Sequence, residues 1–134
     1  MSRSIGDLSR VTGTKVETIR YYERIGLMPQ PERTTGNYRA YDKGQLDRLS
    51  FIRRCRDLGF SLDQVRALLS LSDDQERDCA GIDSIAQEHL LEVDRKLADL
   101  TALRRELKAV IDSCDGGTVG QCRIVEALGP LSVA

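Results

Sequence analysis

The chain has 134 residues, 40% of them hydrophobic and 31% charged, which allows one compact domain with an extension or a small domain in an obligate dimer. No apolar run is long enough to span a bilayer and the N-terminus lacks a signal peptide's apolar segment, so we expect a cytoplasmic protein with no membrane partner. The net charge of −1 divides into +5 over residues 1–70 and −6 over residues 71–134, which suits a DNA-binding head followed by a solvent-facing body.

The first two predicted helices are separated by a tight turn. Apolar residues recur at helical spacing over residues 5–11, and Gly13 then breaks the pattern. Thr14 and Glu17 fit a capping box, which predicts that a second helix begins at Lys15. Helix, tight turn and helix is the arrangement in which the second helix lies in the major groove of DNA.

The second helix combines basic and aromatic side chains on one face. Its outer face holds Arg20, Tyr21 and Arg24, while Ile19 and Leu27 face inward. Cations suit phosphate contacts, and planar or short polar groups suit packing into a groove. The DNA contacts expected from this helix are Thr14, Lys15, Thr18, Arg20, Tyr21 and Arg24.

A short hairpin follows the prolines that end the second helix. It extends from Arg33 to Tyr41, with Gly36 and Asn37 at its tip. A basic hairpin of this kind forms a wing that can lie along a phosphate backbone. The DNA contacts expected from the wing are Arg33, Tyr38, Arg39 and Tyr41.

Two further helices complete the head, which we place at residues 1–71. Caps are expected at Asp42 for the third helix and at Ser61 for the fourth. Cys55 repeats with the apolar residues of the third helix and is therefore expected in the core. On the opposite face lies an arginine cluster, for which phosphate contact and simple solvation are equal alternatives. The cluster consists of Arg53, Arg54 and Arg56.

A long helix is predicted after an acidic linker at residues 72–81. Residues 82–113 contain neither Gly nor Pro, so one helix of roughly 45–50 Å is allowed. Its apolar residues follow the alternating three- and four-residue spacing of a heptad seam. They are Leu90, Val93, Leu97, Leu100, Leu107 and Ile111. A single helix cannot bury such a stripe, and a coiled-coil dimer can.

Three cysteines flank this helix. Cys79 precedes it, whereas Cys114 and Cys122 follow it and are separated by seven residues of a glycine-containing loop within residues 114–134. About 50 Å of helix keeps Cys79 away from Cys114 in one chain. In an antiparallel homodimer the start of one helix meets the end of the other, which gives two equivalent three-thiol sites.

Three thiolates favour soft, thiophilic ions. Candidates are Hg(II), Cd(II), Pb(II), Cu(I), and Zn(II) with a fourth ligand. The only histidine, His89, is expected at an interface or on a polar face rather than at the metal. The sequence thus predicts a mainly α protein, with a winged helix-turn-helix domain, an antiparallel coiled-coil dimerisation helix and a C-terminal metal-binding loop.

No catalytic constellation is present in the sequence, and we predict no enzyme. Two other classes stay open. One is a regulator of the same fold that senses oxidants or electrophiles through its thiols. The other is a coiled-coil adaptor that recruits partners through its acidic half.

The order of these parts resembles the MerR family of bacterial transcription regulators. The residues that carry the resemblance are Arg20-Tyr21-Tyr22-Glu23, Gly26-Leu27, Arg33, Gly36, Tyr38-Arg39, Tyr41 and Leu58-Gly59-Phe60-Ser61-Leu62. The resemblance implies a dimer that binds an over-long promoter spacer. On sensing its effector, such a dimer distorts and underwinds the DNA so that RNA polymerase can use both promoter elements.

The resemblance also bears on the metal. A cysteine at the position of Cys79 looks like the branch that senses divalent Cd, Pb, Zn or Hg. The loop spacing and the turn at Asp115, Gly116 and Gly117 look more like the Cu(I)/Ag(I) branch. The adjacent second cysteine and loop histidine of the zinc branch are absent.

Overall fold

The computed structural model describes residues 3–36, 39–114 and 116–129 and divides into two compact units, Met1–Ile85 and Ala86–Ala134. The structure is mainly α, as predicted. None of the helices in the described ranges combines the length and apolar character needed to cross a membrane.

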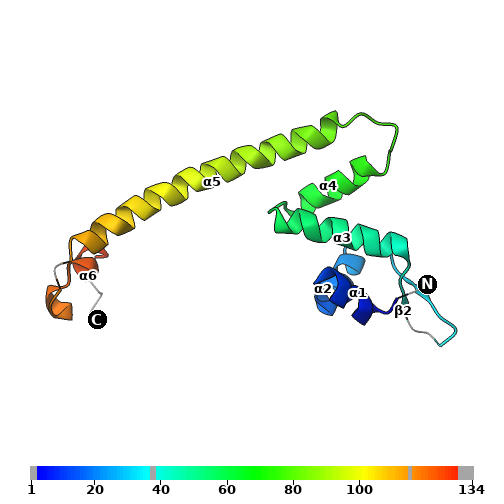
Figure 1. Cartoon of the computed structure of the whole chain (residues 1–134), viewed down its shortest axis with the longest axis horizontal. Helices are drawn as coiled ribbons and strands as arrows, with labels where there is room; N and C mark the ends of the chain where they lie inside the picture. Colours follow the sequence, from blue (N-terminus) through cyan, green and yellow to red (C-terminus); the bar gives the residue numbers. More distant parts are fainter. Residues whose placement is uncertain (1–2, 37–38, 115, 130–134) are drawn as a thin grey trace. The chain divides into compact units, whose positions relative to one another are not determined.

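Among the described residues, the first unit contains four whole helices, the start of a fifth and a two-stranded sheet, and Figure 1 shows their order along the chain. Its elements are α1 (Ile5–Thr12), α2 (Val16–Arg24), β1 (Glu32–Arg33), β2 (Arg39–Ala40), α3 (Lys43–Asp57) and α4 (Leu62–Ser72). Helix α1 packs against both α2 and α3, and α4 packs against α3. The predicted helix-turn-helix and the two helices that follow it are therefore confirmed.

Side-chain caps fix the helix starts. The caps predicted at Asp42 and Ser61 are both present as reciprocal capping boxes, and Ser4 forms a third at α1. The box predicted for Thr14 is wrong. The N-cap of α2 is Lys15, which makes no side-chain capping bond, because the Thr14 side chain turns into the protein interior instead.

The wing is a short antiparallel hairpin with an additional bridge. Glu32 pairs with Ala40 and Arg33 pairs with Arg39. The backbone of Tyr41 exchanges two hydrogen bonds with Arg3, at 2.8 and 2.9 Å, so the N-terminal segment supports the return strand. The predicted tip residue Asn37 and the predicted contact Tyr38 lie outside the described residues.

One apolar core holds the first unit together. The fully or largely buried side chains are Leu8, Ile19, Tyr22, Leu27, Met28, Tyr41, Leu49, Ile52, Cys55, Val65, Leu68 and Leu69. Ile82 and Ile85, from the start of the next helix, pack against this core. This packing explains why the compact unit continues to Ile85, beyond the predicted limit at residue 71.

The remaining helices are α5 (Ala80–Asp112), η1 (Val119–Gln121) and α6 (Arg123–Ala127). Helix α5 begins two residues before the predicted start, where the Asp78 carboxylate accepts a hydrogen bond from the Ala80 amide at 3.1 Å. The leucines of the predicted seam are more than half exposed in the single chain. They are Leu90, Leu97, Leu100 and Leu107.

Candidate DNA-binding surface and thiol site

Helix α2 presents a basic and aromatic face to solvent. Ile19 is fully buried on one side, and Arg20 and Arg24 are exposed on the other. The guanidinium carbon of Arg24 lies 5.4 Å from the centre of the Tyr21 ring, within cation–π distance. The predicted outward orientation of Arg20, Tyr21 and Arg24 is present, while their contact with DNA remains a prediction.

Two arginines from the scaffold fix the C-terminal end of α2. Arg66 of α4 donates to the carbonyl oxygen of Ile25 at 3.0 Å, and Arg48 of α3 donates to that of Leu27 at 2.9 Å. Ile25 is the C-cap of α2 and Leu27 follows it, so neither carbonyl is bonded within the helix, and these bonds satisfy groups that would otherwise need water. They also hold the recognition helix on α3 and α4.

A hollow at the start of α2 gathers positive charge. It is lined by Gly13, Thr14, Lys15, Thr18, Tyr22, Arg53, Arg56 and Asp57. Three cations face one carboxylate there, a balance that suits a phosphate group. Arg53 and Arg56 thus reach the hollow, whereas Arg54 of the same cluster does not line it.

Hydrogen bonds keep the turn of the helix-turn-helix in place. Arg53 donates to the Gly13 carbonyl oxygen and, at 3.0 Å, to the Asp57 carboxylate. Thr14 is only 5% exposed, and its hydroxyl has no hydrogen-bond partner among the described residues. Lys15 is exposed and Thr18 half-buried, so these two offer more surface to a ligand than Thr14 does.

A buried carboxylate joins the recognition helix to the wing. Glu23 of α2 accepts a hydrogen bond from the Arg39 guanidinium at 2.7 Å and one from the Tyr41 hydroxyl at 2.6 Å. Its side chain is 2% exposed, and that of Arg39 is 25% exposed. Both carboxylate oxygens therefore have a partner from the wing.

Tyr41 is the clearest departure from the predicted DNA contacts. Its side chain is fully buried, so the prediction that it contacts DNA directly is wrong. Burial, together with the hydrogen bond to Glu23, raises the pKa of Tyr41 to about 12. Arg33 of the wing is exposed.

Glu23 was not anticipated from the sequence as a functional residue. It follows Ile19 by four positions and Tyr22 by one, so it falls on the inward face of α2. A carboxylate at a buried helical position needs hydrogen-bond donors from elsewhere in the chain. This requirement is the feature of the sequence that could have indicated a partnership with an arginine and a tyrosine of the wing.

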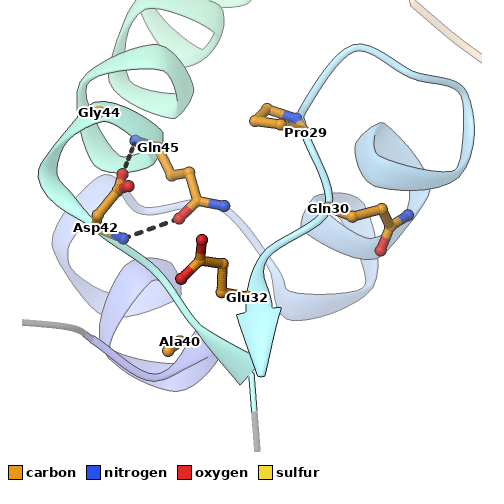
Figure 2. Close-up of a pocket in the computed structure, with 7 residues that line it drawn as sticks. All are labelled: Pro29, Gln30, Glu32, Ala40, Asp42, Gly44 and Gln45. Carbon is orange, nitrogen blue, oxygen red and sulfur yellow. Dashed lines mark hydrogen bonds between the residues drawn. The ribbon is translucent and has the colours of Figure 1, made fainter. Parts of the chain in front are cut away.

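A second hollow lies beside the wing and differs in charge (Figure 2). The carboxylates of Glu32 and Asp42 border it, together with the Gln45 amide. Asp42 and Gln45 are occupied in capping α3, at 2.8 and 2.9 Å. Its negative charge makes this hollow unsuitable for phosphate.

The loop cysteines come together in the second unit. The thiols of Cys114 and Cys122 interact, and both residues are half-buried. The pKa of Cys122 is lowered by the backbone amides of Val125 and Ile124 and, to a lesser degree, by the Cys114 thiol. Cys122 is the N-cap residue of α6, although its side chain makes no capping hydrogen bond of ordinary geometry. An environment that favours the thiolate favours metal binding, because the thiolate is the ligand.

Cys79 lies at the opposite end of α5, one residue before the helix begins, and is exposed. Within the described part of a single chain, no group of three His, Cys, Asp or Glu residues is placed to hold a metal ion. The structure thus brings together two of the three predicted ligands. The third would have to come from elsewhere, as the prediction of a site shared between chains requires.

The remaining cysteine and the histidine, neither of which is expected to bind the metal, are both buried. Cys55 lies in the apolar core, as predicted, and burial raises the pKa of its thiol. His89 is 8% exposed, in contrast to the polar-face alternative.

Comparisons with known proteins find family models that match both the first unit and most of α5. Residues 3–72 match the family model described as MerR HTH family regulatory protein, and residues 46–110 match the model described as MerR, DNA binding. The HTH-type transcriptional regulator HmrR of Rhizobium leguminosarum bv. viciae is 43% identical over 125 residues, which cover 93% of this chain and 96% of HmrR.

Two solved structures are similar over nearly their whole length. The transcription regulator PbrR691 from Ralstonia metallidurans CH34, in complex with lead(II), is 41% identical with a TM-score of 0.81 and covers 95% of this chain and 99% of its own. The dual-function regulator MerR from Bacillus megaterium MB1, in complex with mercury(II), is 34% identical with a TM-score of 0.72 and covers 94% and 98%.

Proposed function

The chain belongs to the MerR family of helix-turn-helix regulators, and we propose that it is a metal-responsive transcription activator acting as a homodimer on promoter DNA. Binding of a thiophilic divalent ion, Cd(II), Pb(II), Hg(II) or Zn(II), is the signal. The lead(II) and mercury(II) complexes of two relatives support this choice. Because its partner is promoter DNA, the protein acts in the bacterial cytoplasm.

The proposed DNA contacts are the members of the predicted set other than the buried Thr14 and Tyr41. They are Lys15, Thr18, Arg20, Tyr21, Arg24, Arg33, Tyr38 and Arg39. Lys15 and Thr18 share the positively charged hollow with Arg53 and Arg56, which we add as phosphate contacts. Thr14 and Tyr41 support the surface from within.

The proposed metal site is shared between two chains. Cys114 and Cys122 of one chain supply two thiolates, and Cys79 of the other supplies the third. Antiparallel α5 helices bring these residues together at each end of the dimer, and pairing of the helices buries the exposed leucine stripe. Three soft thiolates are a donor set that selects soft ions over Mg(II) or Ca(II).

Activation follows from coupling this site to the heads. Distorting and untwisting a promoter spacer costs on the order of 1–6 kcal/mol, and a metal that binds one head arrangement more tightly can supply this energy. RNA polymerase is affected through the shape of the promoter. No chemical step by the protein is needed.

The observation that carries the proposal is the contact between Cys114 and Cys122 in a chain whose other unit is a DNA-binding head. The test is a titration with Hg(II), Cd(II) and Pb(II), followed by the ultraviolet thiolate-to-metal charge-transfer bands. The Cd(II) and Pb(II) bands should weaken and the affinity should fall in C114S, C122S and C79S, because each variant leaves two thiolates at a site built from three. C55S, which changes a core thiol, serves as the control and should titrate like the wild type.

A second candidate is a Cu(I)/Ag(I) sensor that uses the two loop thiols alone. It is favoured by the contact between these thiols within one chain. A C79S protein that still responds fully to Cd(II), Pb(II) and Hg(II) in a transcription assay would exclude the three-thiolate site. A C79S response to Cu(I) alone would establish the second candidate. A response to peroxide in metal-free protein would indicate a thiol redox sensor instead.

A further inference from the structure

Among the described residues of the first unit, Glu23 is the acidic side chain that is buried and bound to two wing residues. It lies on the recognition helix, within the surface assigned to DNA. A negative charge near phosphates opposes binding, so its presence there requires another explanation. The neighbouring acid of the same helix, Glu17, is exposed.

The hydrogen bonds of Glu23 leave part of Arg39 available. One nitrogen, Nη1, donates to the carboxylate at 2.7 Å, and the side chain stays 25% exposed. A guanidinium has five N–H donors in a fixed plane, so fixing one edge fixes the direction of the others. The exposed edge of Arg39 can therefore face a phosphate in a single, preset orientation.

Tyr41 holds the other side of this arrangement. Its hydroxyl donates to the second carboxylate oxygen at 2.6 Å, and its backbone pairs with Arg3. The carboxylate is thus held between a buried ring and a half-buried guanidinium. It connects α2 to β2 at the base of the wing.

We propose that Glu23 is a positioning residue for DNA binding, which orients the Arg39 guanidinium towards a backbone phosphate and fixes the wing on the recognition helix. The inference rests on the proposed DNA-binding function. A carboxylate that does not itself touch DNA thus sets the orientation of a wing residue that does. Arg39 acts on the phosphate only while Glu23 holds it.

The test compares two substitutions that remove the same charge from the same helix. E23Q and E17Q are measured against a duplex selected by the wild-type protein from a random pool, at several salt concentrations. Electrostatics alone predicts that both variants bind as well as the wild type or more tightly. Positioning predicts that E17Q does so, whereas E23Q binds roughly tenfold more weakly, the effect of one lost charge-assisted hydrogen bond.

The salt dependence gives a second readout that a purely structural role would not change. Loss of one phosphate contact lowers the slope of log affinity against log salt by about 1. R39Q should show this loss, E23Q should show the same loss, and the double variant should be no weaker than R39Q. E17Q should keep the wild-type slope.

Thermal melting and size-exclusion chromatography check that each variant is folded. Should E23Q melt below the assay temperature, E23D decides the matter, because it keeps the charge and shortens the reach. Weakened binding by E23D supports the inference, and wild-type binding overturns it. Equal binding by E23Q and E17Q also overturns it, whereas a wild-type protein that binds no duplex at all removes the proposed function itself.

Discussion

Tyr41 is the residue whose titration is changed most clearly by folding. Its pKa of about 12 in the folded protein lies above the ordinary value of 10.0, so the native state holds the proton more tightly than the unfolded state. The stability that this provides is complete below pH 10 and is lost as the pH rises towards 12. Two pKa units correspond to about 3 kcal/mol.

We therefore expect Y41F to change the pH dependence of unfolding. The free energy of unfolding of the wild type should fall by up to about 3 kcal/mol more than that of Y41F between pH 9 and pH 12. Denaturant melts at each pH measure this difference. Y21F removes an exposed tyrosine and should follow the wild type. Parallel curves for Y41F and the wild type would show that Tyr41 does not titrate in this range.

The sequence could not assign every residue of the binding surface. Arg20 and Arg39 look alike in the sequence, since each is an arginine one or two positions from a tyrosine. Only tertiary structure shows that Arg39 pairs with Glu23, sixteen residues away. The expected DNA contact of Tyr41 is wrong for the same reason. The alternation of side chains along a short strand does not show which face of the strand packs against a helix.

At the scale of elements, local patterns were sufficient for the helices. The predicted caps at Asp42 and Ser61 are present because a capping box involves only residues within one turn. The pattern failed at Thr14, where packing between α1, α2 and α3 draws the side chain inward. The approach of Cys114 and Cys122 is predicted from their spacing across a glycine-containing loop, whereas the detailed fold of that loop has no periodic signal.

The seam of α5 leads to a prediction about association. Leu91 and Leu100 are 62% and 61% exposed in the single chain, but they are nine residues apart and therefore lie on opposite faces of the helix. Leu100 belongs to the heptad stripe and Leu91 does not. L100D should dissociate the dimer, because each buried unpaired charge costs roughly 3 kcal/mol or more.

The matched control for L100D is L91D, which places the same charge on the outer face. Light scattering with size-exclusion chromatography should give a monomer for L100D and a dimer for L91D at micromolar concentration. Helix content should be measured for both variants. A dimeric L100D would show that the stripe is not the interface.

At the scale of the whole molecule, the proposed sensor exists only in the dimer. The two loop thiols lie at one end of α5 and Cys79 lies at the other, with a helix of 33 residues between them. Such a helix is about 50 Å long. A third thiolate for Cys114 and Cys122 is therefore expected from a second chain whose helix runs in the opposite direction.

This arrangement predicts complementation between two inactive chains. A C79S chain keeps its loop thiols, and a chain with C114S and C122S keeps Cys79. Each homodimer lacks a complete site, whereas the heterodimer regains one site at one end and has no thiol ligand at the other. Co-expression with two different affinity tags, followed by tandem purification, isolates this heterodimer for titration with Cd(II).

The heterodimer should bind one Cd(II) ion with wild-type charge-transfer intensity per ion, against two for the wild-type dimer. A site built within one chain gives no recovery, because neither chain has all three thiols. Parallel helices also give none, because they place Cys79 beside Cys79 and the two loops beside each other. Recovery of one site therefore distinguishes the antiparallel, shared site from both other arrangements in a single measurement.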